Sequence, residues 1–150
     1  MSGRCKIVEC GKEDYAVLAG IWDNSVRATH RFLTDDAIEE IKSQLIPAYF
    51  PNVDLYAVAD GGSLTGFIGL SGRTIEMLFI DAGRRGCGYG SLLIDFARSK
   101  GADRVDVNEQ NTQALGFYLS KGFRVIGRDE TDDAGRPYPI LHMLLNLTEK

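Results

Sequence analysis

The sequence is poor in cysteine, and its cysteines form no redox or metal-binding pattern. The three residues, Cys5, Cys10 and Cys87, include no C-x-x-C pair. An odd number of cysteines without a secretory signal indicates reduced thiols and argues against a disulfide framework. We therefore expect small packing roles for the thiols, no metal ion and a cytoplasmic location.

Long apolar runs are also absent, and so is an excess of basic residues. No run approaches the ~20 apolar residues that span a membrane, and Met1–Cys10 lacks the apolar core of a signal peptide. The net charge of −4 argues against general nucleic-acid binding but is compatible with a cationic acceptor such as an amine. The 150 residues predict one domain over 1–150, without membrane or nucleic-acid partners.

The most informative part of the chain is a glycine-rich loop and the segments beside it. Residues 75–80 are an apolar run, which predicts a buried strand, and residues 89–97 have the apolar spacing of one helix face. The loop between them holds three glycines at alternate positions, together with Arg84 and Arg85. Glycine lets the backbone approach a ligand closely, and the first N–H groups of a helix have no helical partner. This order of segments therefore predicts an anion site.

Two common phosphate motifs do not fit this loop. A Walker loop needs a lysine near its end, and the dinucleotide fingerprint needs a third glycine where Ser91 stands after Gly86 and Gly88. The pattern R-x-x-G-x-G does fit, as Arg85, Gly88 and Gly90. This resembles the pyrophosphate loop of the GNAT superfamily of N-acetyltransferases, which bind acetyl-coenzyme A.

A second motif follows the first at the spacing usual for that family. The segment 111–123 resembles the signature N-x-x-A-x-x-F-Y-x-x-x-G-F, matched by Asn111, Ala114, Phe117, Tyr118, Gly122 and Phe123. Two motifs in register are far more specific than either alone. The chain is therefore identified by resemblance as a GNAT member, and acetyl-CoA is expected as the acetyl donor.

The remaining segments predict the same fold class. Strands are expected at residues 4–10, 53–59, 64–70, 75–80, 104–107, 123–126 and 140–147. Four helices are expected to begin near residues 13, 35, 88 and 112. Thr34 is the expected N-cap of the second helix, Pro47 its expected end, and an asparagine at 108 or 111 the cap of the fourth. The order βααβββαβαββ predicts an α/β (α+β) GNAT fold, with a mixed sheet of about seven strands flanked by four helices.

The resemblance implies which residues hold the cofactor. The strand ending at Ile80 should diverge from its neighbour, so that its backbone bonds the pantetheine arm, and the loop should cradle the pyrophosphate. Asn111 would touch the pantetheine, cap its helix, or do both. The implied cofactor-binding residues are Leu78, Phe79, Ile80, Arg85, Gly86, Cys87, Gly88, Tyr89, Gly90, Ser91, Asn111 and Phe117.

The resemblance also implies catalytic groups. The N–H of Leu78 would stabilise the oxyanion. Tyr118 stands where the family often places a tyrosine near the sulfur, so it is the expected acid for the leaving thiolate, unless its ring only packs. The attacking amine must lose a proton, and Glu76, raised in pKa by burial in an apolar strand, is the expected base, unless it is a strand-end glutamate that faces solvent. His30 or an ordered water chain are the alternatives, whereas His142 is expected to be structural.

The acceptor is expected to enter opposite the cofactor. Trp22, Arg27 and His30 would bind it, with Ser25, Thr29 and Phe32 on the same wall. The loop 129–139 would form another wall, where Asp132 and Asp133 offer negative charge. A protein lysine or N-terminus, an amino acid, a polyamine and an aminoglycoside all remain open as acceptor, and so do other acyl groups. The alternative function is an acyl-CoA-binding sensor or pseudoenzyme, and the chain is expected to be a monomer or homodimer.

Overall fold

The computed structural model describes residues 5–132 and 134–145. Within these residues the order of strands and α-helices is the predicted βααβββαβαββ. The elements are β1 (Cys5–Glu9), α1 (Tyr15–Thr29), α2 (Asp35–Gln44), β2 (Asp54–Asp60), β3 (Ser63–Ser71), β4 (Thr74–Ile80), α3 (Tyr89–Ser99), β5 (Arg104–Asn108), α4 (Thr112–Ser120), β6 (Phe123–Asp129) and β7 (Ile140–Leu145). Arg4 and residues 146–147, at the outer ends of two predicted strands, lie outside the described residues, as does Asp133.

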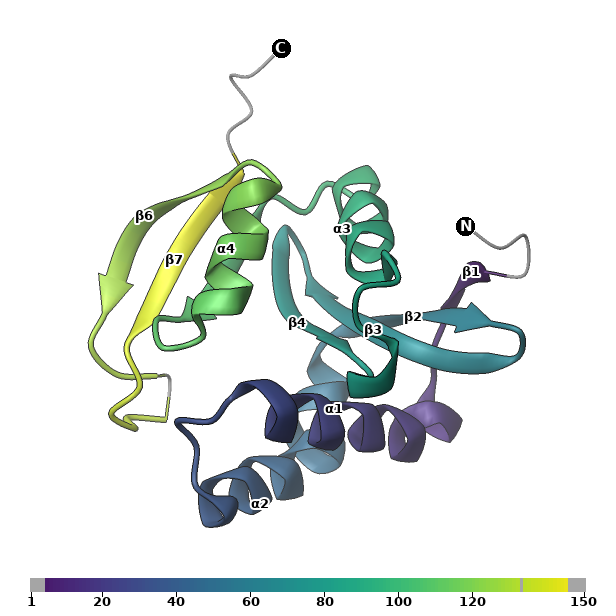
Figure 1. The fold of residues 1–150 in the computed structure, drawn as a ribbon, viewed down its shortest axis with the longest axis horizontal. Coiled ribbons are helices and arrows are strands. Elements are labelled where there is room, and N and C mark those ends of the chain that lie inside the picture. The colour runs from purple at the N-terminus through teal and green to yellow at the C-terminus, as the bar shows by residue number, and fades with distance from the viewer. Residues whose placement is uncertain (1–4, 133, 146–150) are drawn as a thin grey trace.

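The seven described strands form one mixed sheet in the order β1-β2-β3-β4-β5-β7-β6 (Figure 1). All neighbours are antiparallel except β4 and β5, which are parallel. That parallel contact comprises two residue pairs, Thr74 with Arg104 and Ile75 with Val105. Beyond Ile75 the two strands diverge. The predicted divergence is therefore confirmed, and it leaves the edge of β4 facing β5 without a strand partner.

Helices cover both faces of the sheet. Because side chains alternate along a strand, Val58 and Ile68 pack with α3 and α4, whereas Ala57 and Phe67 pack with α1 and α2. In Figure 1, α4 lies in front of β7, and α1 and α2 lie together below the sheet. Among the described residues, no helix has both the length and the apolar content that crossing a bilayer requires.

The α-helix α2 ends at Gln44, shortly before Pro47, so the prediction that the proline stops it is confirmed. After α2 the chain widens into a π-helical turn, Leu45–Tyr49, and then a 3₁₀ turn, Phe50–Asn52. Proline lacks an N–H group and its ring crowds the carbonyl four residues earlier, so an α-helix cannot continue unchanged. A wider turn accommodates both defects, and the buried side chains of Leu45 and Phe50 hold it against the core.

Candidate active site

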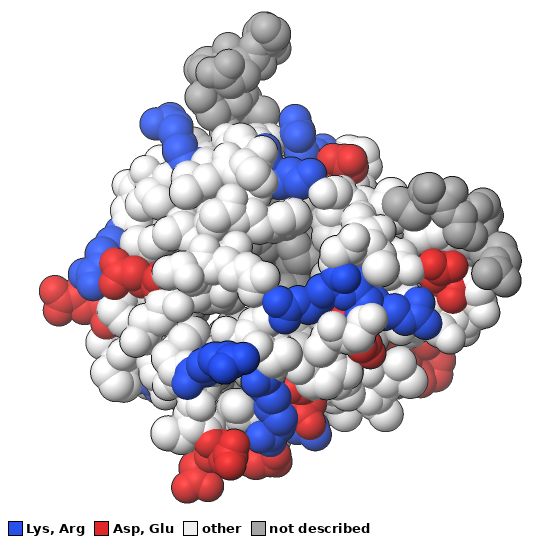
Figure 2. Space-filling model, viewed as in Figure 1, with Lys and Arg blue, Asp and Glu red and all other residues white. Residues whose placement is uncertain are grey.

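A cavity of about 490 Å³ opens where β4 and β5 diverge. Its walls come from residues 76–80 of β4, residues 105–108 of β5, the glycine loop, α4 and the end of α1. Figure 2, in the orientation of Figure 1, shows a hollow near the centre of this face with Lys and Arg side chains beside it. The divergence of the two strands thus creates the space that the sequence assigned to the cofactor.

The glycine loop lines one end of this cavity, and its glycines are required for two different reasons. Gly86 and Gly88 have φ values of 81° and 85°, which side chains other than glycine rarely adopt, and Gly88 is the N-cap of α3. A Cβ at Gly90 would lie 3.3 Å from the ring of Phe117. The glycine at position 90 therefore lets α3 approach α4 closely.

Most of the predicted cofactor residues line the cavity. They are Leu78, Phe79, Ile80, Arg85, Gly86, Gly88, Tyr89, Gly90, Ser91, Asn111 and Phe117. Cys87 does not line the cavity, contrary to the prediction, and is exposed. Sequence reasoning missed Gln113, whose Oε1 accepts a hydrogen bond from Nη2 of Arg85 at 3.1 Å. This contact joins the loop to α4 across the cavity.

The beginning of the loop is held by α1. Asn24 accepts a hydrogen bond from the N–H of Ala82 at 2.9 Å, and its amide donates to Asp81 at 3.3 Å. Asp81 in turn accepts from the N–H of Gly83 at 3.0 Å. The direction in which the loop leaves β4 is therefore fixed by a helix that lies far away in the sequence.

Tyr118 lies on α4 with its ring packed against Phe117 and Phe123. It is 6% exposed and also lines the cavity, so the packing role and the acid role are compatible. Burial raises the pKa of its phenol above the ordinary value. The hydroxyl therefore stays protonated and able to donate across the neutral pH range.

Glu76 is exposed, so the predicted burial of this carboxyl group is wrong. The strand is apolar in sequence, but the divergence from β5 opens the side on which Glu76 lies. The residue does line the cavity, together with Met77 and Phe79. It therefore stands where a general base would be needed, in contact with solvent.

His30 ends α1 and joins a chain of hydrogen bonds. Thr29 Oγ1 donates to the carbonyl of Ser25 at 2.8 Å, so it accepts from Nδ1 of His30, also at 2.8 Å. Nε2 of His30 then accepts from Nδ2 of Asn111 at 3.2 Å. Asn111 Oδ1 accepts from the N–H of Ala114 at 3.1 Å, so Asn111 is the cap of α4.

The surroundings of His30 argue against its role as a general base. Burial lowers the pKa of its imidazole to about 4. At neutral pH the ring is therefore uncharged and a weak base. Its position on the cavity wall and its bond to Asn111 fit a role in shaping the site.

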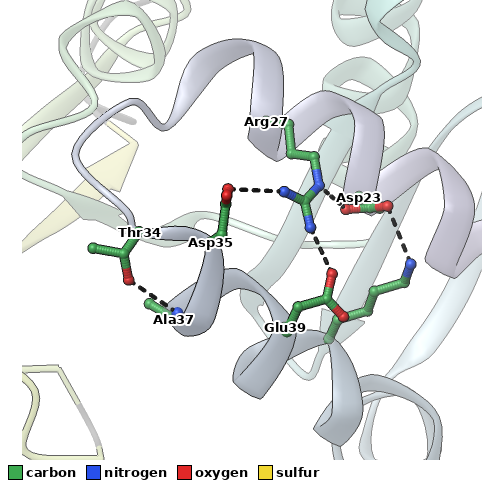
Figure 3. Close-up of polar contacts among 7 residues, drawn as sticks. Asp23, Arg27, Thr34, Asp35, Ala37 and Glu39 are labelled. Carbon is green, nitrogen blue, oxygen red and sulfur yellow. Dashed lines mark hydrogen bonds and ion pairs between the residues drawn. The ribbon is translucent and has the colours of Figure 1, made fainter.

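Arg27 was predicted to bind the acceptor, but it lines no cavity beside β4. Its guanidinium lies 2.7 Å from Asp23, 3.1 Å from Asp35 and 2.6 Å from Glu39 (Figure 3). The carboxylates of α2 draw the side chain away from the sheet and toward the second helix. Arg27 therefore connects α1 to α2.

A second cavity, of about 680 Å³, lies on the other side of the β4–β5 divergence. Trp22 is one of its lining residues and has its ring 6.3 Å from that of Phe79. Four residues line both cavities, namely Glu76, Met77, Phe79 and Asp106. Asp132 and Arg136, which are 3.1 Å apart, come from the loop before β7. The two cavities thus meet at the point where β4 and β5 separate.

His142 is held between two carboxylates. Its Nδ1 lies 2.7 Å from Asp106 and its Nε2 lies 2.8 Å from Asp129. The bond to Asp106 and then the bond to Asp129 raise the pKa of the imidazole. No group of His, Cys, Asp and Glu among the described residues has a geometry suited to a metal ion.

Comparison with known proteins identifies the family. The chain matches the acetyltransferase (GNAT) domain over residues 23–144. It is 43% identical to peptidyl-lysine N-acetyltransferase YjaB of Escherichia coli (strain K12) over 133 residues, which cover 87% of this chain and 90% of that protein. The protein of the same name from Salmonella typhimurium is 42% identical over 134 residues, covering 88% and 92%.

The fold agrees with that match. The structure superposes on the solution structure of apo-form YjaB from Escherichia coli with a TM-score of 0.85 and 39% sequence identity, covering 93% of this chain and 96% of that one. The family match spans both sequence motifs and every residue that the two cavities share. The chain therefore belongs to the GNAT acetyltransferase family and is an acetyl-CoA-dependent N-acetyltransferase.

Proposed function

We propose that this acetyltransferase moves the acetyl group of acetyl-CoA to the side-chain amine of protein lysines. The observation that carries the proposal is the meeting of two cavities at the β4–β5 divergence, one beside an anion-binding loop and the other lined with carboxylates. The two relatives from Escherichia coli and Salmonella typhimurium are named as peptidyl-lysine N-acetyltransferases. These names favour a protein acceptor over the polyamines and aminoglycosides that the sequence left open.

The first cavity fits the donor. The N–H groups around Gly88, at the positive end of the α3 dipole, suit a pyrophosphate, and Arg84 and Arg85 add positive charge. The unpaired edge of β4 suits an extended pantetheine arm, because such an arm offers amide groups that can replace a missing strand. In this arrangement Leu78 provides its N–H near the thioester carbonyl.

The second cavity fits a lysine side chain. Trp22, Met77 and Phe79 offer apolar surface to a four-carbon stem. Glu76 and Asp106 offer negative charge to the ammonium group at the end of that stem. Arg136 does not reverse this charge, because it lies 3.1 Å from Asp132 and 3.8 Å from Glu40.

The reaction is a direct attack. A lysine amine has a pKa of about 10.4 and must first lose a proton, which Glu76 or water accepts from the solvent-facing side. The amine nitrogen then bonds to the acetyl carbon, and the N–H of Leu78 stabilises the oxyanion. When the C–S bond breaks, the hydroxyl of Tyr118 gives its proton to the leaving thiolate, and the second proton, which the nitrogen loses as the amide forms, restores the phenol. We infer that no metal ion takes part.

The test combines binding and turnover. Calorimetry should show binding of acetyl-CoA, and a free-thiol assay should show release that depends on a lysine-containing peptide. The same peptide with norleucine in place of lysine is the matched control and should release no thiol. EDTA should leave the rate unchanged. Thiol release with polyamines but not with peptides would contradict a protein lysine as the acceptor. Binding of acetyl-CoA without thiol release on any amine would favour an acyl-CoA-binding sensor that transfers nothing.

A further inference from the structure

Asp106, His142 and Asp129 form a cluster on the sheet face opposite α4. On β5, Asp106 lies between the buried residues Val105 and Val107, so its side chain points to the other face. On β7, His142 likewise lies between buried residues. The register pairs His142 with Asp106 on one side and with Gly127 of β6 on the other. Three strands thus bring the cluster together.

The imidazole fixes the orientation of Asp106. Its two nitrogens lie 2.7 and 2.8 Å from carboxylate oxygens of Asp106 and Asp129, so both bonds require an N–H and the ring is an imidazolium. The two carboxylates bond opposite edges of the ring and do not converge on one point, which does not suit a metal ion. The cluster as a whole carries one negative charge.

Nearby charges do not cancel that negative charge. Arg128 of β6 is held by Glu109, with Nε and Nη2 at 2.8 and 3.0 Å from its carboxylate. Arg104 of β5 lies 3.6 Å from the carboxylate of Asp103. Glu130, which follows β6, adds negative charge near Arg128.

Asp106 also lies where the two cavities meet. The parallel register ends at Ile75 and Val105, so Glu76 and Asp106 are the next residues on the two diverging strands. Both line both cavities. Glu76 and Asp106 therefore stand on opposite sides of the gap between the two strands, where on the proposed function an acceptor amine would reach the donor.

We propose that Asp106 is the carboxylate that binds the ammonium group of the acceptor lysine, and that His142, backed by Asp129, is the residue that positions it. The inference rests on the proposed function. The imidazolium holds one oxygen of Asp106 toward β7, so the carboxylate faces the junction of the two cavities in one orientation. A charged acceptor is thereby selected over a neutral one.

The experiment compares charged and neutral ligands in the full-length protein. Asp106→Asn should raise the KM for a lysine peptide about tenfold and leave the Kd for acetyl-CoA unchanged. The acetylated product peptide, which has the same backbone but no ammonium group, should keep its inhibition constant. Asp95→Asn, which alters an exposed carboxylate of α3 outside both cavities, is the matched control and should change none of these values.

A second variant tests the positioning role. His142→Gln should raise the KM for the lysine peptide several-fold with a smaller change in kcat, and circular dichroism should show a native fold. An unchanged KM in Asp106→Asn, or an equal loss of affinity for the lysine and acetyl-lysine peptides, would overturn the inference and leave the acetyltransferase intact. A wild-type protein that acetylates no lysine peptide would overturn both proposals.

Discussion

Asn111 donates a hydrogen bond to Nε2 of His30 across 81 positions of sequence, at 3.2 Å. The same asparagine caps α4 through its side-chain oxygen. The end of α1 and the start of α4 are therefore joined over the first cavity by one side chain. Asn111 thus caps α4 as predicted and also lines the first cavity, and its contact with the pantetheine stays a prediction.

The partly buried His30 should make the protein less stable in acid. Its pKa is about 4 in the folded protein and 6.5 in an unfolded chain. Between these values the unfolded chain binds a proton that the folded protein does not, so stability is lost as the pH falls from 6.5 toward 4. The loss should approach about 2–3 kcal/mol. Urea denaturation at neutral pH and near pH 4.5 measures it, and an equal acid loss in His30→Gln would contradict it.

His142 should titrate in the opposite direction. Its pKa is raised by the bonds to Asp106 and Asp129. The stability that His142 adds to the fold is therefore present below 6.5, its pKa in the unfolded chain, and is lost as the pH rises through its pKa in the folded protein. The chain has two histidines, so an NMR titration of the imidazole protons should resolve one pKa below 6.5 and one above it. His142→Gln assigns the signals. A His142 pKa at or below the unfolded value would show that the two carboxylates do not stabilise the imidazolium.

Replacing Tyr118 by Phe should separate packing from chemistry. The ring contacts with Phe117 and Phe123 remain, so the fold and the Kd for acetyl-CoA should be kept. The loss of the proton donor should lower kcat by about a hundredfold, the range typical of a general acid. Steady-state kinetics and calorimetry on the same preparation check both values. An unchanged kcat would leave Tyr118 with its packing role alone.

Gly88→Glu should abolish binding of coenzyme A. The residue has a φ of 85° at the N-cap of α3, so a side chain is strained there and the carboxylate adds negative charge where an anion should bind. Gly20→Ala is the matched control, because Gly20 lies exposed on α1 with nothing near its Cβ position. That control should bind normally and gain about 0.5–1 kcal/mol of stability. Retained affinity in Gly88→Glu would mean that the pyrophosphate binds elsewhere.

Sequence patterns predicted the features that depend on local order. The glycine loop before α3 and the caps at Thr34 and Asn111 are local, and the structure contains all of them. The divergence of β4 from β5 came from the family resemblance and is also present. The α-helix α2 ends before Pro47 as predicted, but the π-helical turn that follows was not predicted, because it is anchored by the burial of Leu45 against distant segments.

The errors at the site have another cause. Glu76 was expected to be buried because its strand is apolar, but burial depends on whether the next strand stays paired. Arg27 was assigned to the acceptor wall because sequence spacing does not show that Asp35 and Glu39 come within reach of it. Asn24 and Gln113 were missed because their partners come from distant segments. Long-range contacts of this kind leave no periodic signal in the chain.

Two residue pairs join β4 to β5, so the halves of the sheet share little backbone bonding. On the proposed function, the donor occupies the missing strand position and makes the contacts that the chain itself does not. Ligand at a hundred times its Kd would add about 2.7 kcal/mol to the free energy of unfolding. The concentration of acetyl-CoA around the protein would then set its lifetime against proteolysis as well as its rate of turnover.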